Sequence, residues 1–307
     1  MVSKIVDSDI SDFIQAWEQA FERKLDGSVY NWIFDSTNNI YTFKDKDKAV
    51  AGYCLKPLDF LCNKNQTKGY LCNNVFVLTV PGFKYQRLKV FDQLSSFAYS
   101  DLEGDWVAFP NKIALMPHLR NGWSKALTLK TYELDWTSFK SVPRPESSNL
   151  LINLSFDRFL ELLSKANILN DNVSFMVKKN SDFFKWRYKD NPRYKYDYFI
   201  YIDDSETLGY VITKFFPERS RVHIVDFSIP FSIGFLNEIL FQIGMFYDDF
   251  GFRILDVLES PIYRSVFDGL GAFTKSEEEL TMIVKGDCFK NLNFHYAHIV
   301  FGDNEVY

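Results

Sequence analysis

His118 is the side chain in this sequence best suited to moving a proton at neutral pH. An imidazole titrates close to neutrality, so it can accept a proton and later return it. Pro117, beside it, suits the first position of a short helix that Gly122 closes. The dipole at a helix start would hold the ring in its neutral, basic form. The sequence therefore predicts a proton-transfer site at His118, although a lone histidine in this place is also compatible with a structural role.

Two further groups of side chains could take part in catalysis or binding. Asp226 lies in an apolar strand-like run, where a carboxylate facing a cleft can act as a base or bind a hydroxyl, or is simply a polar strand residue. The stretch Trp186-Arg187-Tyr188 offers a stacking surface beside a guanidinium, or else core aromatics. His295 and His298 have no third ligand nearby, so we expect no metal site.

The elements that would position His118 lie just before it. The β-branched and aromatic run from Val75 to Val80 predicts a buried strand that ends at Pro81-Gly82. A polar loop, residues 83–88, leads into residues 89–99, whose apolar side chains recur at helical spacing. A second strand is predicted at 105–109. A strand followed by a helix start can present backbone N–H groups to an anionic ligand.

Composition excludes several classes of protein. The 307 residues carry 35 Lys+Arg against 40 Asp+Glu, a net charge of −5, and the charges are interspersed, which argues against a nucleic-acid partner. Apolar residues make up 47% of the chain, enough for real cores. We expect no signal peptide and no membrane span, and hence a cytoplasmic protein with reduced cysteines. The sequence leaves a monomer and a homodimer equally open.

Four landmarks recur in the same order about 150 residues further on, which predicts a duplicated domain. They are the pairs Trp32 and Trp186, Gly52 and Gly209, Pro81 and Pro230, and Gly122 and Gly271. A linker rich in proline and serine, 141–149, separates a predicted N-terminal domain, 1–140, from a C-terminal domain, 150–307. The alternation of helices and strands in each half predicts an α/β fold with helices on both faces of a sheet.

These features resemble the tandem form of the GNAT (Gcn5-related) N-acyltransferases, which implies two domains that each have a mixed, mostly antiparallel sheet flanked by helices. In that family the loop after the central strand has the pattern Arg/Gln-x-x-Gly-x-Gly/Ala, and its backbone amides hold the pyrophosphate of coenzyme A. The matching positions here lack both glycines and are Lys84, Tyr85, Gln86 and Arg87. The oxyanion donor would be a backbone N–H of Val77, Leu78 or Thr79. The resemblance thus implies acyl-CoA as co-substrate.

A second family pattern runs from the fifth strand into the next helix. This chain matches it at Asn111, Ala114, His118, Gly122 and Trp123. By resemblance Asn111 contacts the pantetheine arm, and His118 occupies the position of the tyrosine that protonates the departing thiolate. The second repeat has no such match, which assigns catalysis to the first half and a scaffold or acceptor-binding role to the second.

Other phrases resemble the nucleotide-sugar N-acyltransferases of bacterial surface-polysaccharide synthesis. They are Phe184-Lys-Trp-Arg-Tyr188 with Asn191-Pro192, and Phe109-Pro-Asn111. This implies transfer of an acetyl or 3-hydroxybutanoyl group to the amine of a dTDP-linked amino-dideoxy sugar for O-antigen or capsule. Trp186, Arg187 and Tyr188 would then hold the thymine ring and diphosphate, and Asp226 would contact the sugar. Two alternatives remain open: a degenerate GNAT scaffold without catalysis, and an aminoacyl-tRNA-dependent transferase.

Overall fold

The computed structural model describes residues 1–6, 9–34, 38–79, 87–142, 149–165, 172–203 and 206–303. They group into two compact units. The first unit comprises Met1–Thr128 and Leu280–Leu292, and the second comprises Leu129–Glu279 and Asn293–Tyr307. The predicted linker lies largely outside the described residues. The domain limits 1–140 and 150–307 therefore stay a prediction. No described helix is long and apolar enough to span a membrane.

The first half of the chain supplies ten helices and strands among the described residues. They are β1 (Val2–Lys4), α1 (Ile10–Phe21), α2 (Gly27–Ile33), β2 (Asn39–Asp45), β3 (Lys48–Cys62), β4 (Asn65–Val77), α3 (Arg87–Asp101), β5 (Asp105–Ala108), α4 (Lys112–Arg120) and β6 (Ser124–Asp135).

The second half repeats this order with additional short helical turns. Its main elements are α5 (Trp136–Lys140), β7 (Leu150–Leu154), α6 (Phe156–Lys165), β8 (Phe175–Val177), α7 (Ser181–Phe184), β9 (Asp197–Asp203), β10 (Glu206–Phe216), β11 (Arg221–Ser228), α8 (Ile233–Tyr247), β12 (Ile254–Leu258), α9 (Arg264–Leu270) and β13 (Phe273–Lys285). A π-helical turn, η2 (Lys185–Lys189), continues α7, and the 3₁₀ turns are η3 (Pro217–Arg219), η4 (Asp248–Phe250), η5 (Pro261–Tyr263), η6 (Phe294–Tyr296) and η7 (Phe301–Asp303).

The two units have the same sheet topology, with one exchange of strands. The order β1-β2-β3-β4-β5 in the first unit corresponds to β7-β9-β10-β11-β12 in the second. In both, the last two strands of that series pair in parallel and the others pair antiparallel. The strand β13, from the second half, pairs with β5, whereas β6, from the first half, pairs with β12. Each half thus donates its final strand to the other half's sheet.

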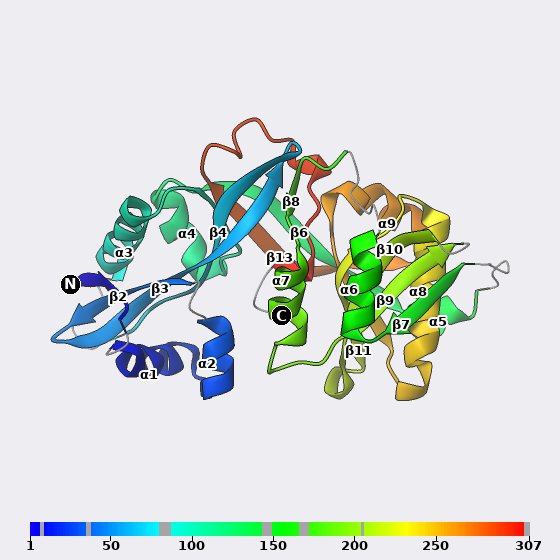
Figure 1. The fold of residues 1–307 in the computed structure, drawn as a ribbon, viewed down its shortest axis with the longest axis horizontal. Helices are drawn as coiled ribbons and strands as arrows, with labels where there is room; N and C mark the ends of the chain where they lie inside the picture. The colour runs from blue at the N-terminus through cyan, green and yellow to red at the C-terminus, as the bar shows by residue number, and fades with distance from the viewer. Residues whose placement is uncertain are drawn as a thin grey trace. The chain divides into compact units, whose positions relative to one another are not determined.

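Helices cover both faces of the strands in the first unit. Figure 1 shows α1 and α2 on one side of β2–β4 and α3 and α4 on the other. The α3 face carries a core in which Val90, Phe91, Leu94 and Ala98 pack on β2–β5. On the opposite side Phe13 of α1 packs edge-on against Phe34, with ring centroids 5.3 Å apart. The predicted helix over 89–99 and the strand over 105–109 are confirmed as α3 and β5.

In the second unit the alternation along the strands separates two apolar layers. Side chains on one face form a core with α8, which buries Leu236, Ile239, Leu240 and Ile243. On the other face Phe159 of α6 contacts Tyr198 and Tyr210. Strands with both faces buried read as near-continuous apolar runs, as these do.

Candidate active site

Strand β4 separates from β5 partway along its length. The parallel pairing with β5 covers only Gly69–Cys72, whereas pairing with β3 continues to Val77. Between these two points the register with β3 shifts by one residue: Gly52 pairs with Phe76 but Cys54 pairs with Asn73. The extra residue of this β-bulge bends the strand away from its neighbour. Among the described residues, no strand pairs with the β5 side of β4 past Cys72, and an extended ligand can pair with that edge as a strand would.

Three buried polar atoms in this part of the first unit have no hydrogen-bond partner among the described residues. They are Nδ2 and Oδ1 of Asn73, the residue after Cys72 on β4, and Nε of Arg87. Arg87 is the first residue of the fifteen-residue helix α3. Buried polar groups are normally paired, so orphaned ones point to a missing ligand or water. A guanidinium at a helix start suits the phosphates of coenzyme A.

The predicted pyrophosphate loop can be located only in part. Lys84, Tyr85 and Gln86 lie outside the described residues, and Arg87 begins α3. Of the predicted oxyanion donors, Leu78 already donates its backbone N–H to the carbonyl oxygen of Val50, at 2.8 Å. Val77 ends β4, and Thr79 is exposed. The assignment of these residues to the cofactor stays a prediction.

Asn111 occupies the start of α4, directly after β5. Its Oδ1 accepts hydrogen bonds from the backbone N–H groups of Ile113 at 3.1 Å and Ala114 at 2.9 Å. The side chain is therefore the N-cap of the helix. The cap uses only the oxygen of the exposed side chain, and the contact of Asn111 with a pantetheine arm stays a prediction.

His118 lies in the last turn of α4, because the helix begins at Lys112 and contains Pro117. The prediction that Pro117 opens this helix was wrong: the capping side chain of Asn111 starts it five residues earlier, and the favourable dipole at a helix start does not act on His118. The predicted closure of the helix by glycine is confirmed, since Gly122 has a φ of +82°.

The imidazole of His118 is 2% exposed and sits among aromatic rings. Its Nδ1 lies 2.8 Å from the carbonyl oxygen of Ala114, so Nδ1 carries the proton and donates it. Nε2 faces the Sγ of Cys72 at 3.7 Å. Burial lowers the pKa of His118, which keeps the ring neutral. The surrounding rings are Tyr53, Phe91 and Trp123. A catalytic role for His118 stays a prediction, and it requires a substrate to reach this interior position.

The equivalent edge in the second unit is closed by its own side chains. Strands β11 and β12 pair only as far as Ile224, and β11 then carries a bulge. Beyond the bulge Nε2 of His298 donates to the carbonyl oxygen of Phe227 at 2.7 Å. The hydroxyl of Tyr263 donates to the carbonyl oxygen of Ile229 at 2.6 Å and accepts from its N–H at 3.1 Å. These contacts occupy the backbone groups that an extended ligand would need.

The predicted acceptor residues lie inside the second unit. Asp226 is fully buried and accepts hydrogen bonds from Lys179 at 2.8 Å, Tyr188 at 2.7 Å and Tyr210 at 3.0 Å. Arg187, also buried, donates from Nε to the carbonyl oxygen of Gly302 at 2.9 Å. The structure brings Tyr188 and Asp226 together, but in the interior of the unit, where both carboxylate oxygens of Asp226 already accept hydrogen bonds.

Trp186 is partly exposed and packs on Phe183, with ring centroids 5.9 Å apart. Binding of a nucleotide by Trp186, Arg187 and Tyr188, and of a sugar by Asp226, stays a prediction.

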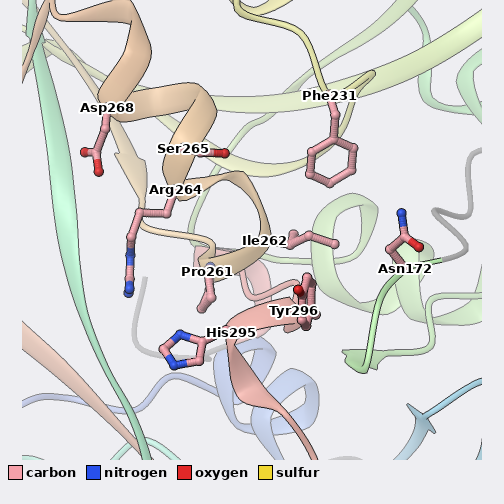
Figure 2. Close-up of a pocket in the computed structure, with 9 residues that line it drawn as sticks. All are labelled: Asn172, Phe231, Pro261, Ile262, Arg264, Ser265, Asp268, His295 and Tyr296. Carbon is pink, nitrogen blue, oxygen red and sulfur yellow. The ribbon is translucent and has the colours of Figure 1, made fainter.

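The second unit contains a cavity of about 810 Å³ that sequence reasoning missed. Figure 2 shows Phe231 and Asn172 on one side of it, and Arg264, Ser265 and Asp268 of α9 on the other. His295 and Tyr296 also line it. These residues come from four separate stretches of the chain, so no local motif could have indicated them. No group of three His, Cys, Asp or Glu side chains suited to a metal ion occurs among the described residues.

Comparison with family models finds no match, and comparison with curated protein sequences finds none either. Similar folds do occur among solved structures. A probable N-acyltransferase from Enterococcus faecalis superposes with a TM-score of 0.72 at 11% identity, covering 93% of this chain and 72% of that one. N-myristoyltransferase of Saccharomyces cerevisiae with bound myristoyl-CoA gives 0.58 at 9% identity, covering 92% and 82%. A tandem GNAT protein from the clavulanic acid biosynthesis pathway gives 0.56 at 10% identity, covering 93% and 98%. The predicted fold is thereby confirmed: the chain has the α/β fold of tandem GNAT proteins, with mostly antiparallel sheets flanked by helices.

Proposed function

We propose that this protein is an N-acyltransferase that takes its acyl group from an acyl-CoA bound along the open edge of β4 in the first unit. The observation that carries the proposal is the difference between the two copies. In the part of the first unit that the structure describes, nothing pairs with the edge past Cys72, whereas His298 and Tyr263 occupy the equivalent edge in the second unit. The pantetheine arm of an acyl-CoA can pair with a strand edge only where no side chain already occupies the backbone groups of that edge.

The side chains near this edge suit the parts of such a ligand. Arg87, at the start of α3, offers a positive charge to the phosphates, and Asn111 offers a free amide nitrogen near the end of β5. The acyl carbonyl would be polarised by a backbone N–H of the Val77–Thr79 stretch. A preorganised donor of this kind contributes roughly 3–4 kcal/mol to transition-state stabilisation.

The reaction is an attack of a neutral amine on the thioester carbon. A C–N bond forms, the C–S bond breaks, the amine loses a proton and the departing sulfur gains one. Holding the two reactants in line contributes on the order of 7–11 kcal/mol, so few catalytic side chains are required. His118 is our candidate for the proton, by its position in the family pattern. Its burial argues for an indirect role unless the aromatic cluster opens.

For the acceptor we propose the amine of a dTDP-linked amino-dideoxy sugar, acylated with an acetyl or 3-hydroxybutanoyl group for surface-polysaccharide synthesis. Its support is the sequence resemblance around Trp186 and Asn111. The acceptor class is a separate question from acyl transfer, and each has its own measurement.

The test is a thiol-release assay that crosses acetyl-CoA and 3-hydroxybutanoyl-CoA with several amines, among them dTDP-linked 3-amino and 4-amino sugars. Calorimetric titration with coenzyme A runs in parallel. Thiol release that depends on both substrates supports the function. Coenzyme A binding without turnover on any amine supports a scaffold instead, and no binding of coenzyme A rejects the proposal.

A further inference from the structure

The cavity of the second unit has a rigid aromatic wall. The ring of Phe231 stacks on that of Tyr263, with centroids 4.3 Å apart and planes 7° from parallel. Tyr263 is itself fixed by the two hydrogen bonds of its hydroxyl to Ile229. Phe231 is 40% exposed and lines the cavity, so its free face is offered to a ligand without loss of side-chain entropy on binding.

The opposite wall presents one donor group and one acceptor group held in place by other residues. Arg264 donates from Nε to Oε1 of Glu259 at 2.6 Å, and Oε2 of Glu259 accepts from the N–H of Lys130. No described residue bonds to the two terminal nitrogens of Arg264. Asp268, four residues later on α9, accepts from the hydroxyl of Tyr132 at 2.8 Å and from Lys275 at 3.0 Å.

Both of these contacts use Oδ1 of Asp268. Its Oδ2 has no partner among the described residues. Residues four apart on a helix lie on one face. A fixed set of free N–H donors therefore stands beside a free carboxylate oxygen, with the hydroxyl of Ser265 between them in sequence.

The charges at this wall cancel. Arg264 is paired with Glu259, and Asp268 is paired with Lys275. An anionic ligand would meet the carboxylate of Asp268, and a cationic one would meet the guanidinium. A neutral ligand whose hydroxyls both donate and accept hydrogen bonds satisfies both groups at once. Its apolar side must also be flat enough to lie on Phe231.

We propose that this cavity binds a sugar ring, with its apolar face on Phe231 and its hydroxyls on the free nitrogens of Arg264 and the free Oδ2 of Asp268. The volume of about 810 Å³ leaves room for a sugar that carries a further group. Under the proposed function, on which this last step rests, that sugar is the amine-bearing acceptor, and only its ring, not its charged diphosphate, meets Arg264 and Asp268.

Saturation-transfer NMR on the full chain tests the site, with glucose, glucosamine and dTDP-glucose as probes. The expected result is transfer onto sugar-ring protons. We expect that transfer to fall at least about fivefold in Phe231→Ala and in Asp268→Asn. The matched controls are Phe250→Ala and Asp249→Asn, two exposed residues of the same unit outside the cavity, and they should leave the signal unchanged. Melting temperatures identify any variant that fails to fold.

Two further arms separate the outcomes. If dTDP binds as tightly as dTDP-glucose and no sugar proton is saturated, the site recognises nucleotides and the proposal is overturned. Equal signals in the cavity variants and their controls overturn it as well. Calorimetric titration with coenzyme A is repeated on Asp268→Asn, which should leave coenzyme A binding unchanged if the cofactor binds in the first unit. Sugar binding without coenzyme A binding rejects the acyltransferase and keeps the sugar site. Coenzyme A binding without sugar binding keeps the acyltransferase and rejects the sugar site.

Discussion

The Sγ atoms of Cys62 and Cys288 lie 2.8 Å apart, although 226 residues separate them in the sequence. Cys62 ends β3, and Cys288 follows the exchanged strand β13. A disulfide here would fasten the end of the exchanged strand to the first unit. Adding oxidised glutathione should convert the two thiols to a disulfide with loss of two hydrogens, while the glutathione disulfide is reduced. Mass spectrometry of non-reduced peptides would detect the 62–288 link.

The chemistry of this pair sets the conditions. The pKa of Cys288 is raised far above its usual range by the contact with Cys62, by burial and by Asp105. Because the thiolate is the reacting form, oxidation should accelerate as the pH rises. Closing so long a loop should raise the free energy of unfolding by up to about 4 kcal/mol. Cys288→Ser should abolish the effect, whereas Cys54→Ser should not. A link from Cys54 or Cys72 instead would contradict this arrangement.

Arg87→Gln should weaken coenzyme A binding about tenfold, a loss of about 1.4 kcal/mol, because a charged guanidinium at the start of α3, whose Nε has no hydrogen-bond partner among the described residues, is replaced by a neutral amide. Calorimetric titration at two salt concentrations measures it, and the loss should shrink at high salt, where screening weakens the charge. Arg120→Gln, on the exposed side of α4 in the same unit, is the control. Equal affinities in the two variants would remove Arg87 from the site.

The order of elements was accessible from the sequence because each depends on local pattern. The helical spacing that predicts α3 is a signal of this kind. The apolar run from Val75 locates only the end of β4, which begins ten residues earlier at Asn65. The exchange of β6 and β13 could not be predicted, because nothing in the sequence of either strand indicates which strand it pairs with. The predicted start of α4 is wrong for a different reason. The resemblance assigns Asn111 to a ligand contact, although asparagine is also a preferred N-cap.

The residues that line the cavity of the second unit could not be grouped from the sequence either. Phe231 follows β11, whereas Arg264 and Asp268 lie on α9, so only the fold makes them neighbours. The burial of Arg187 and Asp226 was equally hidden. Charged residues are rarely buried without partners, and their partners here come from distant segments.

His118→Asn should lower the free energy of unfolding by about 1–3 kcal/mol, because it removes a buried ring and the hydrogen bond to Ala114. Urea unfolding measures it, with the exposed His295→Asn as control. The pKa of His118 is lowered in the folded state, so the unfolded chain binds the proton more readily. Stability should therefore fall as the pH drops below about 6.5, and the substitution should remove that part of the acid sensitivity. A fall of about 100-fold in turnover with unchanged stability would instead favour proton transfer by His118.

Lys214 tests how stability depends on pH above neutrality, since its ammonium group is buried without a hydrogen bond. The side chain lies on β10 and is 2% exposed. Its Nζ has no hydrogen-bond partner among the described residues. The ring centroids of Tyr194 and Phe216 lie 2.9 and 3.9 Å from Nζ. Burial lowers the pKa of Lys214 to about 7, helped by the positive charges of Arg187, Arg219 and Arg193 and opposed by Glu218.

Between pH 7 and about 10.5 the unfolded chain holds a proton on Lys214 that the folded chain has released. The free energy of unfolding therefore rises with pH across that window. Below pH 7 both states hold the proton, and the full cost of burying the charged amine lowers stability. Lys214→Met, of similar length and without charge, should raise the free energy of unfolding at pH 6 by about 1–3 kcal/mol. The gain should vanish near pH 10. Urea unfolding at both pH values measures this, with the exposed Lys195→Met as control. A gain that is the same at both pH values would mean that the amine keeps its proton in the fold and that packing, not charge, sets its cost.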